Sequence, residues 1–222
     1  MAENPLLPHR KLQELSTTLE RARVLEKKQR TAHRREAILA ATTMQLDKGD
    51  FLSHAASDKP AALLAPSQTP RSSDEATRLL LAAATARGQQ LCGDRLTLAL
   101  TTAGEKVASW QQAIALAQAE RLPFVLCITD PTGGKARRGT LSWPEFDAFC
   151  RKTQMPVLSV DGEDAVAMYR AMQECALRAR TSMGPATIWA VVTPASTKLS
   201  AAQTPVARMR RYLLARDIDL PE

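Results

Sequence analysis

Aromatic residues are scarce in this chain: Phe, Trp and Tyr make up 4% of its 222 residues, although hydrophobic residues make up 45%. Because alanine supplies much of that hydrophobic content, close packing of helices on a sheet is favoured over a core of large rings. No apolar run reaches the roughly 20 residues that a membrane-spanning helix needs. The polar start, Met1 to Pro5, is not followed by the apolar stretch of a signal peptide. We therefore expect a cytoplasmic protein without a membrane segment.

Histidine and cysteine are too few and too scattered to predict a metal site or a nucleophile. The three histidines all lie in the first quarter of the chain, without the spacing of metal ligands: His9, His33 and His54. The four cysteines form no Cys-x-x-Cys pair and are predicted to be reduced thiols in or near the core: Cys92, Cys127, Cys150 and Cys175. No Ser-His-Asp arrangement can be placed. We predict no catalytic residue and no metal ligand.

Four short apolar runs without polar alternation predict strands buried on both faces of a parallel sheet. They occupy residues 96–100, 124–128, 157–160 and 187–193. Patterns of helical spacing, some opened by capping signatures, separate these runs. We predict helices at 9–30, 34–46, 76–87, 106–121, 142–153, 164–181 and 206–215. This alternation predicts an α/β fold with a doubly wound, mainly parallel sheet.

The length predicts a single domain, with an N-terminal helical arm at residues 1–35 and the α/β domain at 36–222. The net charge of +7 has a local source, since residues 10–36 hold nine Lys or Arg against four Glu. A basic helix can bind nucleic acid or an acidic partner. The glutamates interrupt the basic run, and no aromatic residue is interleaved for base stacking. We therefore expect a solvated helix face and no tight binding of nucleic acid.

A glycine-rich basic loop follows the second apolar run, at residues 132–139. It contains Gly133, Gly134, Lys135, Arg137 and Arg138. It is not a phosphate-binding P-loop, because the upstream glycine is missing and Ala136 stands in place of Ser or Thr. The pattern favours a flexible surface loop over an anion site, and its role is left open.

The block 96–131 reads LTLALTTAGEKVASWQQAIALAQAERLPFVLCITDP. It resembles the alpha subunit of the thiamine-diphosphate-dependent 2-oxo acid dehydrogenases, the first component of the pyruvate and branched-chain complexes. In that family the first strand runs into Gly-Asp-Gly and the second ends in Asn-Asn, and an Asp and an Asn hold the magnesium of the cofactor. The resemblance implies the thiamine-diphosphate-binding fold, in which ligands bind at the carboxyl ends of the strands.

The resemblance extends over several separate segments in the same order. Upstream, Arg35-Glu36-Ala37 and 46–51 are similar to the family's Gly-Gln-Glu-Ala segment and its continuation. Downstream, 156–157, 160–164 with Tyr169, 178–180 and 184–185 match the third strand, its Asp-Gly turn and the following helix. The chain is shortened around 66–73, where the family has a long Gly-rich segment.

The positions that carry the family's chemistry hold other residues here. Gly-Asp-Gly falls on Thr101, Thr102 and Ala103, and the Asn pair begins at Asp130. The Tyr-Arg pair that grips the diphosphate falls on Ala56 and Ser57, and its following His on Lys59. A cofactor-side Arg falls on Ala195 and a catalytic His on Leu199, while Ser200 remains. Each charged hydrogen bond to the cofactor contributes about 1.5–3 kcal/mol of binding free energy. Micromolar affinity corresponds to roughly 8 kcal/mol in total, so the loss of several such bonds removes more than half of it.

We therefore interpret the chain as a degenerate homologue of the dehydrogenase alpha subunit that lacks both thiamine diphosphate and magnesium and is non-catalytic or structural. By the same resemblance its partner is a second copy of itself or a beta-type subunit. Two alternatives stay open. One is a working oxidoreductase subunit whose cofactor is held mainly by the beta-type partner, and the other is a basic interaction module that uses the N-terminal helix.

Overall fold

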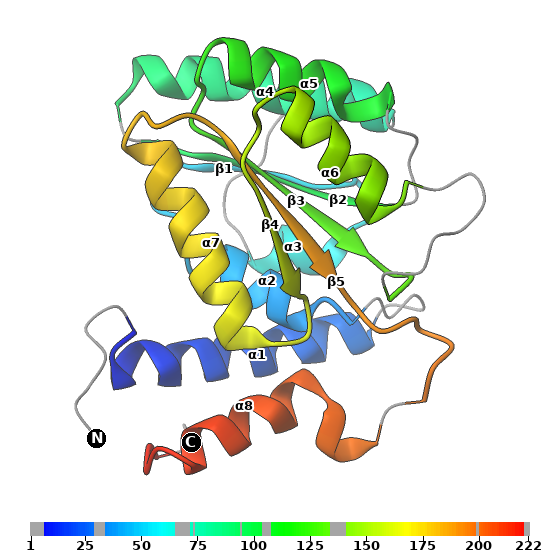
Figure 1. The fold of residues 1–222 in the computed structure, drawn as a ribbon. Coiled ribbons are helices and arrows are strands. Elements are labelled where there is room, and N and C mark those ends of the chain that lie inside the picture. The colour runs from blue at the N-terminus through cyan, green and yellow to red at the C-terminus, as the bar shows by residue number, and fades with distance from the viewer. Residues whose placement is uncertain are drawn as a thin grey trace.

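The centre of the protein is a five-stranded sheet in which all neighbouring strands run parallel, in the order β1-β2-β3-β5-β4 (Figure 1). The computed structural model describes residues 7–28, 34–64, 72, 74–93, 95–103, 108–133, 141–198 and 200–219. The strands are β1 (Phe51–Ser53), β2 (Thr97–Thr102), β3 (Phe124–Asp130), β4 (Val157–Asp161) and β5 (Ala186–Val191). The doubly wound α/β fold that the sequence predicts is confirmed.

Helices cover both faces of the sheet (Figure 1). One face carries α4 (Glu75–Leu91), α5 (Ala108–Ala119) and α6 (Trp143–Lys152). The other carries α1 (His9–Lys27), α2 (Glu36–Thr43), α3 (Lys59–Leu64), α7 (Ala165–Arg180) and α8 (Pro205–Leu214), with a short 3₁₀ turn, η1 (Ala201–Gln203), before α8. Right-handed crossovers explain this division: the chain moves across the sheet one way through α4, α5 and α6, and returns from β4 to β5 through α7.

The central strands β2, β3 and β5 are buried on both faces, so their alternate residues contribute to two separate cores. The prediction of burial on both faces was wrong for 157–160, because β4 is an edge strand with Ser159 and Asp161 exposed. Leu98 and Leu100 of β2 join the core beneath α1, α2 and α7, whereas Ala99 joins the core beneath α4 and α5. The second core is held by an aromatic cluster in which the rings of Phe146 and Trp189 stack at a centroid distance of 5.1 Å. The few aromatic residues of the chain are thus concentrated under α6.

Local capping agrees with the sequence signatures. The Asp164 carboxylate accepts the N–H groups of Val166 and Ala167, both at 3.0 Å, and so caps α7. At α6, the Ser142 N–H and hydroxyl both donate to Glu145, at 2.9 and 2.7 Å. These bonds hold the pKa of the Glu145 carboxyl below its usual range.

Strand β1, helix α3 and the η1 turn were not predicted, because three to six residues give too little periodicity.

The basic helix α1 packs on α2, α7 and α8, so one of its faces is part of the core. Its glutamates make ion pairs on several sides: Glu14 with Lys11, Glu20 with Arg210 and Glu26 with Arg35. The boundary at residue 35 and the absence of tight nucleic-acid binding stay predictions. No helix in the part of the chain that the structure describes combines the length and hydropathy needed to cross a membrane.

The alanine-rich helix α5 packs closely on α4. Ala113 and Ala117 are buried against a matching row on α4 that includes Ala82, Ala83 and Ala86. These small side chains serve packing within the chain, while Ala115 and Ala119 of α5 are exposed. One expectation was wrong: Cys92 ends α4 exposed to solvent, whereas the other three cysteines are buried.

Candidate functional site

The positions that the sequence singled out meet at one edge of the sheet, where the parallel strands end. Thr102 pairs with Thr129 across β2 and β3, and Asp130 pairs with Val191 across β3 and β5. The loop that follows β1 holds Ala56 and Ser57, both exposed. Because all strands point the same way, their carboxyl ends form a common edge, which is where ligands bind in such sheets.

The end of β2 offers hydroxyl and backbone groups in place of a carboxylate. The Thr101 hydroxyl donates to Glu75 Oε1 at 2.5 Å, and the Ala103 N–H donates to the Thr129 carbonyl at 2.8 Å. Thr101 and Ala103 are buried, and Thr102 is half-buried. A threonine hydroxyl is a poor replacement for the anionic oxygen that magnesium prefers.

Asp130 is the one acid among the cofactor positions carried over from the family, and both of its carboxylate oxygens accept hydrogen bonds. Oδ1 accepts the Thr132 N–H at 2.9 Å and the Thr132 hydroxyl at 2.6 Å. Oδ2 accepts the indole N–H of Trp189 at 3.2 Å. Asp130 is 3% exposed. The carboxylate therefore fixes the turn after β3 and anchors a core tryptophan.

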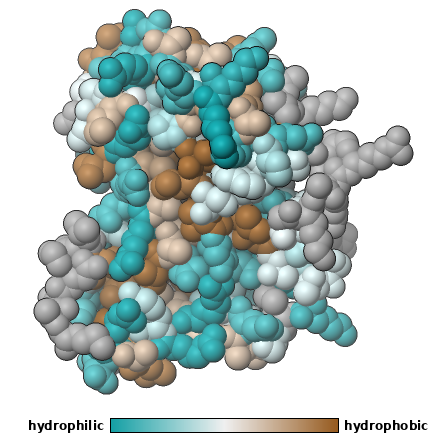
Figure 2. Space-filling view, in the orientation of Figure 1, coloured by the Kyte–Doolittle hydropathy of each residue, from teal (hydrophilic) through white to brown (hydrophobic). Residues whose placement is uncertain are grey.

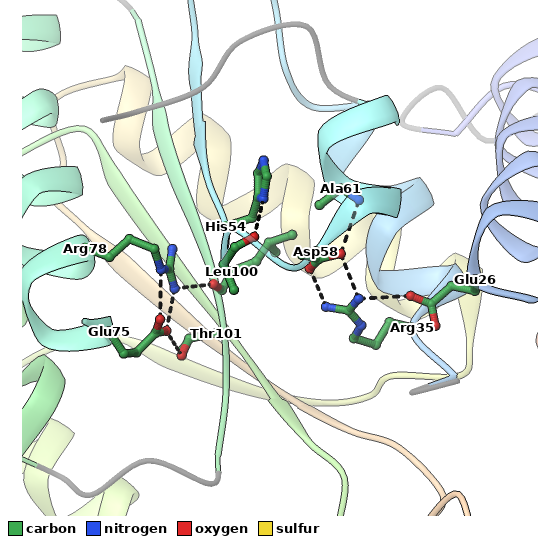
Figure 3. A network of polar contacts seen from close by, with 10 residues as sticks. Glu26, Arg35, His54, Asp58, Ala61, Glu75, Arg78, Leu100 and Thr101 are labelled. Carbon is green, nitrogen blue, oxygen red and sulfur yellow. Dashed lines mark hydrogen bonds and ion pairs between the residues drawn. The ribbon is translucent and has the colours of Figure 1, made fainter. Parts of the chain in front are cut away.

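Next to the loop after β1 lies a buried ion-pair network (Figure 3). Arg35 donates to both oxygens of Asp58, at 2.7 and 3.0 Å, and to Glu26 at 2.9 Å. Burial raises the pKa of the Asp58 carboxyl, but the hydrogen bonds and charge of Arg35 outweigh it and leave that pKa below its usual range. Likewise, burial lowers the pKa of Arg35, and the bond to Asp58 reverses this to a net rise.

A second network lies under the end of β2 (Figure 3). Arg78 is 1% exposed and donates to Glu75, to the Ser53 hydroxyl at 2.7 Å and to the Leu100 carbonyl at 2.7 Å. It thereby ties α4 to β1 and β2. Between the two networks lies a cavity of about 160 Å³, lined by Arg35, Ala55, Asp58, Glu75, Leu100, Thr101 and Thr102.

This small cavity is a poor match for a magnesium diphosphate. Its two arginines, Arg35 and the adjoining Arg78, are already paired with carboxylates, and its volume is below the several hundred Å³ of a usual cofactor pocket. Within the described residues, no group of three or more His, Cys, Asp or Glu is placed to hold a metal ion. The side chains around this cavity therefore do not fit a magnesium diphosphate.

The remaining predicted positions are only partly described. Ala195 is exposed in the loop after β5. It follows Thr193, which donates two hydrogen bonds to the Glu163 carboxylate. Leu199 lies outside the described residues, as does the basic loop after Gly133. His54 donates from Nδ1 to the Ala55 carbonyl at 2.9 Å.

Comparison with known proteins assigns the family. The model of the dehydrogenase E1 component family matches residues 78–192, which is just over half of the chain. The chain belongs to the dehydrogenase E1 component family. The matched region runs from Arg78 to the end of β5 and so includes the ends of β2 and β3. The E1 family is thiamine-diphosphate-dependent, as the resemblance of block 96–131 implied.

Solved structures share the fold of this E1 homologue at low sequence identity. One is a Mycobacterium smegmatis protein assigned to the thiamin diphosphate-dependent enzymes, with 14% identity and a TM-score of 0.53 over 71% of this chain. Another is benzoylformate decarboxylase from Polynucleobacter necessarius, with 15% identity and a TM-score of 0.52 over 77% of this chain. The matches cover 31% and 34% of those chains, so the E1 homologue spans about a third of their length. No curated protein matches it significantly.

Most contacts of the two ion-pair networks have no local sequence signature. Arg35 and Asp58 are 23 residues apart, and Arg78 and Ser53 are 25 apart, so only the tertiary fold brings them together. One weak signal was available: Glu75 and Arg78 stand at the i, i+3 spacing of a helical ion pair.

Proposed function

We propose that this E1 homologue is non-catalytic and has lost the binding of thiamine diphosphate and magnesium. The observation that carries the proposal is the chemistry of the carboxyl edge. Thr101, Thr102 and Ala103 end β2, and the only acid at the end of β3 is committed to Thr132 and Trp189. Neither strand end therefore offers a free anionic oxygen to a metal.

The loop after β1 supports the same proposal. Ala56 and Ser57 supply no cation for a diphosphate, and the Arg35 guanidinium, which lines the small cavity beside them, is held by Asp58 and Glu26. Moving Arg35 toward a cofactor would take the cationic partner away from these two buried carboxylates, which costs several kcal/mol. The role that remains is structural: a folded partner for a second copy or for a beta-type subunit.

The test is a turnover assay. The purified chain is supplied with pyruvate, or with a branched-chain 2-oxo acid, together with thiamine diphosphate, magnesium and ferricyanide as electron acceptor. The assay is run on the chain alone and with a beta-type E1 subunit added. We expect no ferricyanide reduction above a sample without the chain in either case, whether or not the two proteins coelute in gel filtration. Turnover that appears only with the beta-type subunit would instead establish the working-subunit alternative.

A further inference from the structure

A second and larger cavity lies along the same edge, on the far side of β3 from the networks described above. Its volume is about 780 Å³, and it opens at the ends of β3, β4 and β5 beneath the start of α8. Its polar walls include Thr132, Glu163, Thr193, Gln203, Arg208 and Arg211. We call it the α8 cavity. A volume of this size is typical of a small-molecule site.

The α8 cavity coincides with the topological switch point of the sheet. After β3 the chain passes to α6 on one face, and after the adjacent β5 it passes to α8 on the opposite face (Figure 1). Neighbouring parallel strands whose connections leave to opposite faces open a crevice at their carboxyl ends, where ligands of α/β proteins bind. Among the carried-over cofactor positions that the structure describes, none lines this cavity, although Thr132 and Pro194 in its wall lie close in sequence to Asp130 and Ala195.

The acidic groups in its wall are satisfied from within the protein. Glu163 is 5% exposed and accepts the N–H and the hydroxyl of Thr193, at 3.1 and 3.0 Å. Asp161 accepts the Glu163 N–H at 2.9 Å and an Arg208 N–H at 2.8 Å. Burial lowers the pKa of Arg208, and its bonds to Asp161 raise it by more, so this guanidinium stays charged.

The cationic groups retain unused donors. Within the part of the chain that the structure describes, the bonds of Arg208 to Asp161 and Asp164 both come from Nη2. Arg211, one turn further along α8, is exposed and makes one hydrogen bond within the described part of the chain, to the Ala202 carbonyl at 2.9 Å. A guanidinium has five donors in a planar fork that matches an oxyanion. The unused hydrogen-bond donors in the cavity wall therefore belong to positively charged groups.

We propose that the α8 cavity binds a small organic anion, a carboxylate or a phosphate ester, whose oxyanion is held by Arg211 beside Arg208. Charge-assisted bonds from a guanidinium fork are about twice as strong as neutral ones, so Arg211 supplies most of the affinity. The threonine hydroxyls and the backbone at the ends of β3 and β5 contact the polar body of the ligand. This site operates without thiamine diphosphate and goes beyond the proposed loss of catalysis.

The test is ligand-observed NMR and calorimetry on the whole chain with two probes, pyruvate for the carboxylate and glycerol 3-phosphate for the phosphate ester. Arg211→Gln removes the fork at an exposed position. Arg210→Gln is the matched control. Arg210 directly precedes Arg211 in α8 but forms an ion pair with Glu20 of α1. Ser159→Phe fills the cavity from β4, where Ser159 is exposed.

We expect at least one probe to bind at low millimolar concentration or below, and the preferred probe identifies the anion. Arg211→Gln should weaken that binding about 10-fold, equivalent to about 1.4 kcal/mol, and Arg210→Gln less than 2-fold. Ser159→Phe should abolish it while circular dichroism shows an unchanged fold. Failure of both probes to bind at about 10 mM, or equal weakening by Arg210→Gln and Arg211→Gln, would overturn the proposal.

Discussion

Most buried acids of this protein serve as structural acceptors. Asp130 holds a turn and a tryptophan, Asp58 holds Arg35, and Glu163 holds Thr193. A buried carboxylate that loses its partner strongly destabilises a protein, so we expect replacement of any of these partners to lower the free energy of unfolding. The exception is Glu36, whose Oε2 is buried without a hydrogen-bond partner in the described part of the chain.

Glu36 gives a prediction about pH. Burial raises the pKa of its carboxyl above the ordinary 4.5 and outweighs the lowering by a hydrogen bond from its own backbone N–H. The charges of Glu26 and Glu163 raise the pKa further, and the charge of Arg23 lowers it. The folded state therefore holds this proton more tightly than the unfolded chain, and stability falls as pH rises from about 4.5 through the folded pKa. Glu36→Gln should stabilise the protein by about 1–2 kcal/mol at pH 7, because it removes a poorly solvated charge whose Oε2 is buried without a hydrogen-bond partner among the described residues. Below pH 4.5 the gain should vanish.

Urea unfolding at several pH values measures this effect. Glu14→Gln is the matched control, since Glu14 lies on the surface of α1 beside Lys11 and its replacement should change little. A Glu36→Gln variant that is less stable than the parent at pH 7, or equally stabilised at pH 4 and 7, would contradict this account of the carboxyl.

At the scale of elements, the strand ends decide what the protein can bind, and tight backbone approaches fix those ends. The turn from β4 into α7 passes so close to β5 that the Gly162 N–H donates to the Val191 carbonyl at 2.7 Å. A Cβ added at Gly162 would lie 2.8 Å from Val192 Cγ1 and 3.0 Å from the Val191 carbonyl oxygen. A backbone oxygen in a paired strand cannot move aside cheaply.

Gly162→Ala is therefore expected to destabilise the protein by about 1–3 kcal/mol, the usual cost of overpacking. Gly88→Ala is the opposite control: Gly88 lies in α4, and an added Cβ meets nothing within 4 Å. There alanine should stabilise by about 0.5–1 kcal/mol through helix propensity. Thermal unfolding of both variants measures the two effects, and a Gly162→Ala variant as stable as the parent would refute the close approach.

The helices and strands were easier to predict from the sequence than the contacts of the site. Long periodic segments such as 164–181, and apolar runs such as 124–128, were predicted in type and nearly in extent, since burial on both faces leaves a clear pattern. The site was predicted as a set of strand ends but not as a set of contacts. The engagement of Asp130 by Trp189 joins residues 59 apart and depends on the pairing of β3 with β5, which no local pattern encodes.

At the scale of the whole molecule, this E1 homologue shares its fold with thiamine-diphosphate-dependent enzymes. Strand β3 divides the carboxyl edge of its sheet into two regions. Toward β1 lie ion-pair networks around a small cavity, and toward β4 lies the larger α8 cavity. The proposed loss of the cofactor concerns the first region alone, so the two proposals can fail independently.

The most direct test of the central claim is calorimetric titration of thiamine diphosphate with magnesium into the isolated chain, carried to about 1 mM cofactor. An active E1 component that binds the same cofactor is titrated in parallel to show that the measurement is sensitive enough. Our account predicts no saturable heat for this chain, because neither β2 nor β3 ends in a free carboxylate and the guanidinium groups of Arg35 and Arg78 are already paired with carboxylates. A micromolar dissociation constant for the isolated chain would contradict it.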